Sequence, residues 1–255
     1  MYLLVVGLVV SVAALFSLSF LFWRQGRKFR QVEKENAGMK AKLGAWGKNR
    51  LDADKEVKES YRYLIRKFQE VANIHQHETS AHLDRVSIFS GMIAAYFGAS
   101  QQEQEDIMIF SRLHDLGKVL VPLDIVMKPG KLNMEEIRTM RRHTLWGAEL
   151  IGMAEWLSVA YNICLTHHER WDGTGYPYGL KGKEIPLEGR IVAFADVYDA
   201  LRSPRSYKKA LTHEEVTKIL MEGDGRTLPH HFDPDILGFF AEHHEEMGRL
   251  FDDLH

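Results

Sequence analysis

Cysteine is nearly absent from this sequence, and neither net charge nor strand-like patterning is pronounced. Among its 255 residues is one cysteine, Cys164, which excludes an internal disulfide and fits a reducing compartment. The formal net charge is -2, so the overall charge does not indicate binding to a nucleic-acid polymer. No segment shows the alternation of apolar and polar residues expected of a β-strand. With 45% hydrophobic residues, the chain is long enough for one globular core and an appendage.

Charged residues are also missing from the first segment, Met1–Trp23. This apolar run has about the length, ~20 residues, that a helix needs to cross a bilayer. A secretory signal peptide is the alternative, but it would have basic residues before a shorter apolar core and small residues at a cleavage site. Here the basic residues follow the run, beginning at Arg24, and the positive-inside rule then places the rest of the chain in the cytoplasm. We therefore expect residues 1–23 to form a single-pass membrane anchor.

Residues 24–71 predict a helical linker, because apolar residues recur there at a spacing of three and four. Asn36 falls at a core position of this heptad pattern, where asparagine can set the register of a dimer. Gly38, Gly44 and Gly47 weaken the repeat, at about 1 kcal/mol each. A homodimeric coiled coil and a single helix that packs onto the following domain both fit this pattern.

From about residue 72 onward, one helical pattern follows another, separated by glycine and proline. We therefore predict an all-α fold in which a transmembrane helix and a helical linker precede a compact helical domain. The predicted boundaries place this domain at residues 72–240 and a C-terminal helical tail at residues 241–255.

Three clusters of polar residues interrupt the helical patterns. Two adjacent histidines, His167 and His168, lead into a glycine-rich loop that ends at Tyr176-Pro177. A second cluster, His114-Asp115-Leu116-Gly117-Lys118, lies upstream, and a third, Ala195-Asp196-Val197-Tyr198-Asp199, lies downstream. Imidazole, carboxylate and ammonium groups in such clusters indicate a multinuclear metal site that handles phosphate.

The spacing of the candidate ligands indicates how they could share ions. Glu78 and His82 are four residues apart, so one helix face presents both. His114 and Asp115 are neighbours and point about 100° apart around a helix, and the carboxylate has two oxygens with which to bridge two ions. Asp196 lies in an otherwise apolar helix, where an unpaired carboxylate would be costly and a metal would neutralise it. The full candidate set is Glu78, His82, His114, Asp115, His143, His167, His168 and Asp196. Ligands of this kind without thiolate suit iron or manganese, with nickel, cobalt or zinc as alternatives.

The remaining polar residues have simpler interpretations. A lone histidine is usually a surface or hydrogen-bonded residue, and we assign that role to His75, His77, His213, His230, His231, His243, His244 and His255. Asp124 and Glu169 are interpreted as solvated or capping residues.

Taken together, the motifs resemble the HD-GYP family, a subgroup of the HD phosphohydrolase superfamily. The resemblance extends from about Ile74 to Pro234. It rests on Glu78-x-x-x-His82-x-x-Arg85, the segment from His114 to Lys118, His143-x-x-x-Gly147, the segment from His167 to Pro177, Asp196-x-x-Asp199 and His231-Phe232-Asp233-Pro234. It implies a metal-dependent phosphodiesterase of bacterial signalling that hydrolyses cyclic di-GMP to linear pGpG and, in some members, to GMP. With the predicted anchor, this implies a location at the bacterial inner membrane.

The resemblance also implies roles for individual residues. The metal ligands would be His82, His114, Asp115, His143, His167, His168 and Asp196. Glu78 matches a position that distinguishes members with a third metal, so two or three divalent ions are expected. Lys118, Tyr176, Arg205 and Lys208 match positions that contact substrate phosphate, and Asp199 would orient ligands or substrate.

The expected mechanism follows from this arrangement. Two ions about 3.5–4 Å apart would share a bridging water, held in part by Asp115, and the resulting hydroxide would attack phosphorus in line with the departing ribose oxygen. The ions and Lys118 would neutralise charge on the phosphoryl oxygens. Arg205 can bind a phosphate with two hydrogen bonds, whereas Lys208 supplies a point charge.

Two alternatives stay open at this point. The chain could bind a nucleotide as a signalling module with weak hydrolysis, or it could hydrolyse another cyclic dinucleotide such as cyclic GMP-AMP. The sequence departs from the family pattern at Thr144, where many members have proline, and at residues 223–230, which form a longer connection than usual. Neither departure removes a predicted ligand.

Overall fold

The computed structural model describes residues 79–204 and 210–254, together with scattered positions from Lys34 to Lys67. Every regular element in these residues is a helix, which confirms the predicted all-α fold. The predicted anchor and most of the linker lie outside the described residues, so the anchor and the coiled coil stay predictions. Within the described residues, no helix combines the length and the apolar character needed to cross a membrane.

The chain divides into two units, Met1–Tyr61 and Arg62–His255. The described residues of the first unit, from Lys34 to Ser60, are helical and exposed. The longer helices of the second unit are α2 (Ser80–Tyr96), α3 (Gln101–Ser111), α5 (Met134–Arg141), α6 (His143–Ile151), α7 (Ser158–Thr166), α8 (Leu187–Arg202), α9 (His213–Glu222) and α10 (Pro234–Asp253). Shorter elements are η1 (Leu116–Leu120), α4 (Leu123–Val126), η2 (Glu155–Leu157), η3 (Gly182–Glu184) and η4 (Pro229–His231).

Capping residues determine where several helices begin. Ser100, Asn133 and Thr212 each accept a backbone N–H from the first turn of the following helix. In all three, a glutamate three residues further on accepts the N–H of the capping residue in return. Such reciprocal bonds satisfy donors that a helix cannot satisfy internally, so the local sequence alone specifies these helix starts.

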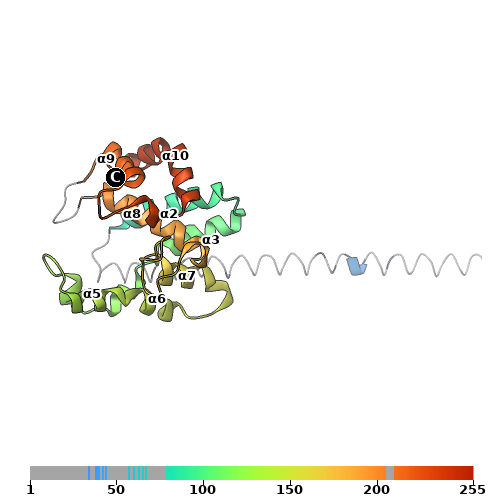
Figure 1. The fold of residues 1–255 in the computed structure, drawn as a ribbon. Helices are drawn as coiled ribbons and strands as arrows, with labels where there is room; N and C mark the ends of the chain where they lie inside the picture. The colour runs from blue at the N-terminus through green and yellow to red at the C-terminus, as the bar shows by residue number, and fades with distance from the viewer. Residues whose placement is uncertain are drawn as a thin grey trace, which may run out of the picture. The chain divides into compact units, whose positions relative to one another are not determined.

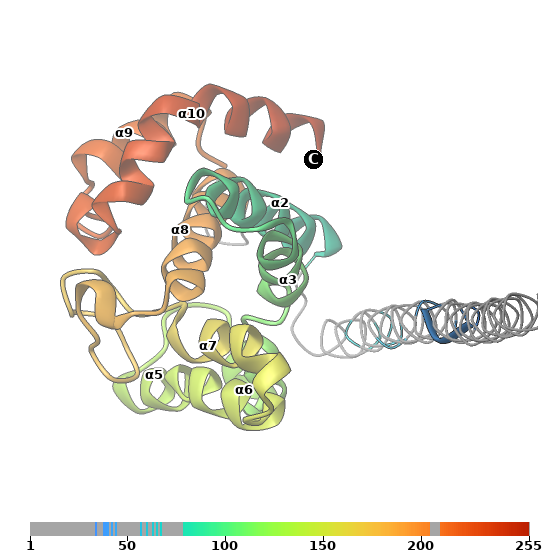
Figure 2. The same cartoon turned by 90° about the vertical axis from the view of Figure 1, so that its right-hand side faces the viewer.

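Helix α8 lies at the centre of this unit (Figures 1 and 2). It packs against α2, α7, α9 and α10, while α3 packs on α2 and α6 packs on α7. Its apolar residues Ile191, Phe194 and Tyr198 are fully buried, and the two aromatic rings make edge contacts with Phe240 of α10. Because α8 is surrounded, the carboxylates on it are brought next to residues from several other helices.

The C-terminal segment is part of this core. The boundary predicted at residue 240 falls inside the continuous helix α10, so the separate tail predicted at residues 241–255 is not what the structure shows. Beyond that boundary, Met247 and Phe251 are buried in the same hydrophobic core as α8. Burial of these apolar side chains is favourable, and α10 achieves it by packing against α2, α8 and α9.

Gly117 allows η1 to lie directly against α6. A Cβ at this position would stand 1.9 Å from the carbonyl oxygen of His143 and 2.4 Å from the backbone nitrogen of Gly147. The φ of Gly117 is not in the left-handed region, so the position requires glycine for lack of space and not for a backbone conformation. The close approach brings Asp115 next to His143.

Replacing this glycine should therefore affect both stability and the position of Asp115. We expect Gly117→Ala to lower the free energy of unfolding by about 1–3 kcal/mol, because the methyl group must push two backbone segments apart. Chemical denaturation of the purified chain measures this change. Gly238→Ala is the matched control, because position 238 is an exposed site on α10 where nothing lies within 4 Å of the added Cβ, and alanine favours helix by about 1 kcal/mol. Equal stability of Gly117→Ala and the unchanged protein would contradict the packing argument.

Candidate functional site

Four of the predicted ligands form one group in the structure. Asp115, His143, His167 and His168 each offer an atom within 4.8 Å of the others. The Nε2 atoms of His143 and His167 lie 3.2 Å and 3.7 Å from Oδ1 of Asp115, and 3.4 Å from each other. His143 begins α6, and the two adjacent histidines follow the end of α7. The start of η1, the start of α6 and the end of α7 therefore come together at this group.

His82, His114 and Asp196 form a second group within the same distance limit. Oδ1 of Asp196 lies 3.7 Å from Nε2 of His82 and 4.0 Å from Nε2 of His114. His82 lies on α2, Asp196 on α8, and His114 in the turn after α3. The packing of α2 on α8 brings His82 and Asp196 together.

Asp115 joins the two groups. Its Oδ1 faces the first group, whereas its Oδ2 lies 3.2 Å from Nε2 of His114 in the second. Burial by itself would raise the pKa of this carboxyl, but the Lys118 ammonium beside it and the imidazole of His114 hold the pKa well below its usual range. A buried, ionised carboxylate with one oxygen toward each group is suited to bridging two cations.

Hydrogen bonds on the outer side of the rings orient the imidazoles toward these groups. The Nδ1 atoms of His114 and His143 lie 2.8 Å and 2.7 Å from the carbonyl oxygens of Ser111 and Met140, and Nδ1 of His167 lies 3.0 Å from that of Ile163. A carbonyl accepts only, so Nδ1 carries the proton and the lone pair of Nε2 points inward. Neutral imidazoles fixed in this way are the usual arrangement of metal-binding histidines.

The pKa shifts agree with neutral, ligand-like imidazoles. Burial lowers the pKa of His143 to about 4, and burial together with the neighbouring histidines His167 and His143 lowers that of His168 well below its usual value. Several inward lone pairs and two carboxylates without a thiolate fit divalent metal ions. The donor set present therefore matches the predicted cofactor.

The glycine-rich loop places Tyr176 over the first group. The phenol ring stacks on His168 with 4.8 Å between centroids and 28° between planes. Gly175 permits this approach, since a Cβ there would lie 2.3 Å from the backbone nitrogen of Arg170. The guanidinium of Arg141 lies 4.8 Å from the centre of the same ring. Burial raises the pKa of Tyr176, so its hydroxyl stays protonated and can donate to a phosphate oxygen.

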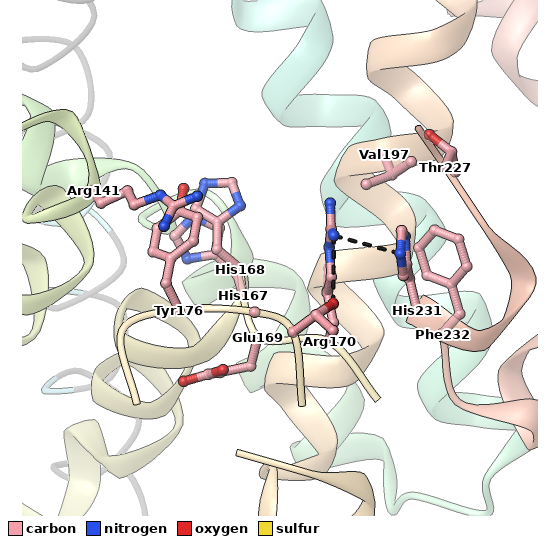
Figure 3. A pocket seen from close by; sticks show the side chains of 13 residues that line it. Arg141, His167, His168, Glu169, Arg170, Tyr176, Val197, Thr227, His231 and Phe232 are labelled. Carbon is pink, nitrogen blue, oxygen red and sulfur yellow. Dashed lines mark hydrogen bonds between the residues drawn. The ribbon is translucent and has the colours of Figure 1, made fainter. Parts of the chain in front are cut away.

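Glu169 differs from its expected role as a solvated or capping residue. Its side chain is buried, points away from the histidines in Figure 3, and accepts the backbone N–H groups of Tyr178, Gly179 and Leu180 at 2.8 Å, 3.1 Å and 3.1 Å. These three hydrogen bonds fix the segment that directly follows Tyr176 and Pro177 in the glycine-rich loop. Its position directly after two predicted ligands was the signal in the sequence.

Asp199 was expected to orient ligands or substrate, and its contacts are with His82, Arg85 and Ser203. Its carboxylate is fully buried, where it accepts from the guanidinium of Arg85 and lies 2.7 Å from Nδ1 of His82. The hydroxyl of Ser203 donates to it at 3.1 Å. The geometry therefore supports the role of orienting a predicted ligand, His82, and the partner Arg85 was not assigned a role from sequence.

The other predicted substrate contacts are only partly described. Lys118 is half-buried beside Oδ2 of Asp115, with which it forms an ion pair. Glu78, Arg205 and Lys208 lie outside the described residues, so the third ion and the two phosphate contacts stay predictions.

A cavity lies beside the first group of ligands (Figure 3). His167, His168 and Tyr176 are among the residues that line one side of it, and Thr227, His231 and Phe232 are among those that line the other. Thr227, which belongs to the connection of residues 223–230 that departs from the family pattern, thus contributes to the lining of the cavity.

Asp172, His230 and His231 form a further, more exposed group with metal-like spacing. Nη1 of Arg170 lies 3.4 Å from Nε2 of His231. Because this guanidinium is permanently charged, it disfavours a metal ion there.

Comparisons with known proteins identify the family to which this chain belongs. Residues 66–236 match the model of a family described as HD domain. The chain is 38% identical to 3'3'-cGAMP-specific phosphodiesterase 2 of Vibrio cholerae, over 75% of this chain and 36% of that protein. It is 40% identical to a cyclic di-GMP phosphodiesterase of Vibrio cholerae, over 75% of this chain and 41% of that protein. It is 38% identical to the cyclic di-GMP phosphodiesterase response regulator RpfG of Xanthomonas campestris, over 80% of this chain and 53% of that protein.

The chain thus spans between about a third and a half of the length of these relatives. The fold is also similar to that of Bd1817, an HDG"Y"P protein from Bdellovibrio bacteriovorus, with a TM-score of 0.52, 21% identity, and coverage of 76% of this chain and 64% of that chain. The family match and the ligand motifs lead to one assignment. The chain belongs to the HD domain family, in its HD-GYP branch.

Proposed function

We propose that this chain is a metal-dependent phosphodiesterase that hydrolyses cyclic di-GMP, with linear pGpG as the product of the first cleavage and GMP as the product of a second. The observation that carries the proposal is the position of Asp115, with one carboxylate oxygen toward each of two histidine groups. Metal ions bound there would lower the pKa of water and neutralise charge on the phosphoryl group. Iron or manganese suits these ligands, and Glu78 supports a third ion.

The chain's own residues would bind and orient the substrate. The protonated hydroxyl of Tyr176 can donate to a phosphate oxygen at the first group of ligands. Lys118 places a positive charge beside Asp115, where charge develops on phosphorus-bound oxygens. The stacked layer of His168, Tyr176 and Arg141 forms one wall of the cavity and keeps the phenol in place.

A second candidate is the hydrolysis of cyclic GMP-AMP. It is favoured by the 38% identity to a protein of Vibrio cholerae whose name specifies 3'3'-cGAMP. A nucleotide-binding module with weak hydrolysis is the third reading, and the ligand groups found together in the described residues argue against it. Anchoring by residues 1–23 in the bacterial inner membrane and dimerisation through residues 24–71 complete the proposal.

The test is metal-dependent turnover by the full chain. The protein would be purified without oxygen, its bound metals quantified, and cyclic di-GMP and cyclic GMP-AMP followed by chromatography with iron, manganese or no metal. We expect conversion of cyclic di-GMP to pGpG or GMP that stops when a chelator removes the ions. Faster conversion of cyclic GMP-AMP would support the second candidate. Binding of nucleotide and metal without product would support the module.

A further inference from the structure

Arg170 and His231 lie next to each other on the wall of the cavity opposite the predicted metal ligands. Figure 3 shows them on the side opposite Tyr176, Arg141 and His168. Arg170 follows the two adjacent histidines by two residues, whereas His231 ends η4. Neither was predicted to bind substrate, and His231 was assigned to the ordinary surface histidines.

Two N–H donors approach the imidazole of His231, one at each ring nitrogen, although a neutral ring has a single lone pair. The backbone N–H of Leu228 points at Nδ1 of His231 from 3.3 Å, and Nη1 of Arg170 lies 3.4 Å from Nε2. A neutral imidazole has one N–H and one lone pair, and a guanidinium has donors alone. Whichever ring nitrogen carries the proton, one pair of donors faces each other. A hydrogen-bond acceptor placed between the Arg170 and His231 side chains would resolve this conflict.

The charge around the pair favours an anion as that acceptor. Burial, together with the nearby Arg170 cation, lowers the pKa of His231, so the imidazole is neutral and the guanidinium supplies the positive charge. The carboxylate of Asp172 does not neutralise Arg170 directly. Its Oδ1 accepts from Thr174, and its Oδ2 lies 3.6 Å from Nε2 of His230. The Arg170 guanidinium contacts Thr174 Oγ1 at 3.4 Å and is otherwise exposed to the cavity side.

A cyclic dinucleotide contains two phosphodiesters, of which the metal centre can act on one at a time. We propose that Arg170 and His231 bind the phosphodiester that is not being cleaved, and so fix the substrate across the cavity. Guanidinium groups bind phosphate with paired, charge-assisted hydrogen bonds, which suits them to this role. Phe232 and Val197 line the same side and give apolar cover to the sugar rings. This assignment rests on the proposed function.

The test is a comparison of steady-state kinetics for Arg170→Gln and the unchanged full chain on cyclic di-GMP. An interaction made equally in the bound substrate and the transition state contributes to KM and leaves kcat unchanged. We expect KM to rise about tenfold, because a charged hydrogen bond contributes roughly 1.5 kcal/mol, while kcat stays within about twofold. His231→Phe, which keeps a ring in place, should raise KM in the same direction. Arg226→Gln is the matched control, because Arg226 is an exposed arginine in the connection of residues 223–230 and does not line the cavity.

Several outcomes would overturn the assignment. An unchanged KM for Arg170→Gln would do so, and so would a loss of kcat accompanied by a loss of bound metal, which would instead connect Arg170 to the metal centre. A contact with the guanine base, rather than with phosphate, would make the KM effect on cyclic di-GMP clearly larger than that on cyclic GMP-AMP. If the unchanged chain does not turn over cyclic di-GMP, the proposed function fails by itself. Calorimetric affinities of the unchanged chain and Arg170→Gln for cyclic di-GMP then decide the inference, and equal affinities or no binding would overturn it.

Discussion

An Asp115→Asn variant should keep its fold and lose roughly 1,000-fold or more in kcat for the cyclic dinucleotide. The amide has nearly the size of the carboxylate, but it has no negative charge and cannot offer one anionic oxygen to each histidine group. The predicted ions would therefore lose their shared ligand. In the structure, Asp115 is the residue through which the two groups are joined. Within the part of the chain that the structure describes, the other members of the first group are histidines, so none of them can supply a carboxylate in its place.

The measurement combines kcat, metal content and circular dichroism of the full chain after reconstitution with iron or manganese. Asp124→Asn is the control, since it makes the same chemical change at an exposed residue of α4. Its kcat and metal content should stay at the original values. Unaltered turnover by Asp115→Asn with a full complement of metal would refute the bridging role. Loss of helical signal in that variant would show that the residue is needed for folding as well.

Removal of one partner from the Arg85–Asp199 pair should strongly destabilise the domain. Both side chains are at most 3% exposed, and the Arg85 guanidinium also lies 4.5 Å from the ring centre of Phe251. Arg85→Met leaves a buried carboxylate without its cation, and such a change costs about 3–5 kcal/mol in the free energy of unfolding. The corresponding control is Arg112→Met, because Arg112 pairs with Asp84 at a more exposed site between α2 and α3. That change should cost no more than about 1 kcal/mol.

The double variant Arg85→Met/Asp199→Leu separates stability from the positioning of His82. Apolar residues of similar volume often replace a buried ion pair without loss, so its stability should return close to the original value. Nδ1 of His82, however, would lose the carboxylate that lies 2.7 Å away. Loss of such an outer partner lowers metal affinity by about 10–100-fold. Metal titration of the apo-protein measures this, and an affinity equal to that of the unchanged chain would show that Asp199 does not position His82.

The sequence by itself determined the fold class and the kinds of ligand. Helical periodicity, capping residues such as Ser100 and the absence of strand alternation are local properties, so they could be interpreted without knowing which helices meet. Adjacent pairs such as His167 and His168 were recognisable for the same reason, because their chemistry lies in residue type and spacing along one segment. The extent of the domain was underestimated, since the apolar residues of α10 do not reveal from sequence what they pack against.

The tertiary structure alone decided which residues act together. His82 and Asp196 are more than 100 positions apart in sequence, and the packing of α2 on α8 brings them within 3.7 Å of each other. The same packing buries Asp199 against Arg85 and His82, which favours the orientation of a predicted ligand over the orientation of substrate. Arg170 and His231 meet because the segment that follows α7 and the end of η4 lie next to each other, where the backbone N–H of Trp171 donates to the carbonyl oxygen of His231. Contacts between helices depend on the shape of the whole core, whereas a sequence pattern reports the surroundings of one segment at a time.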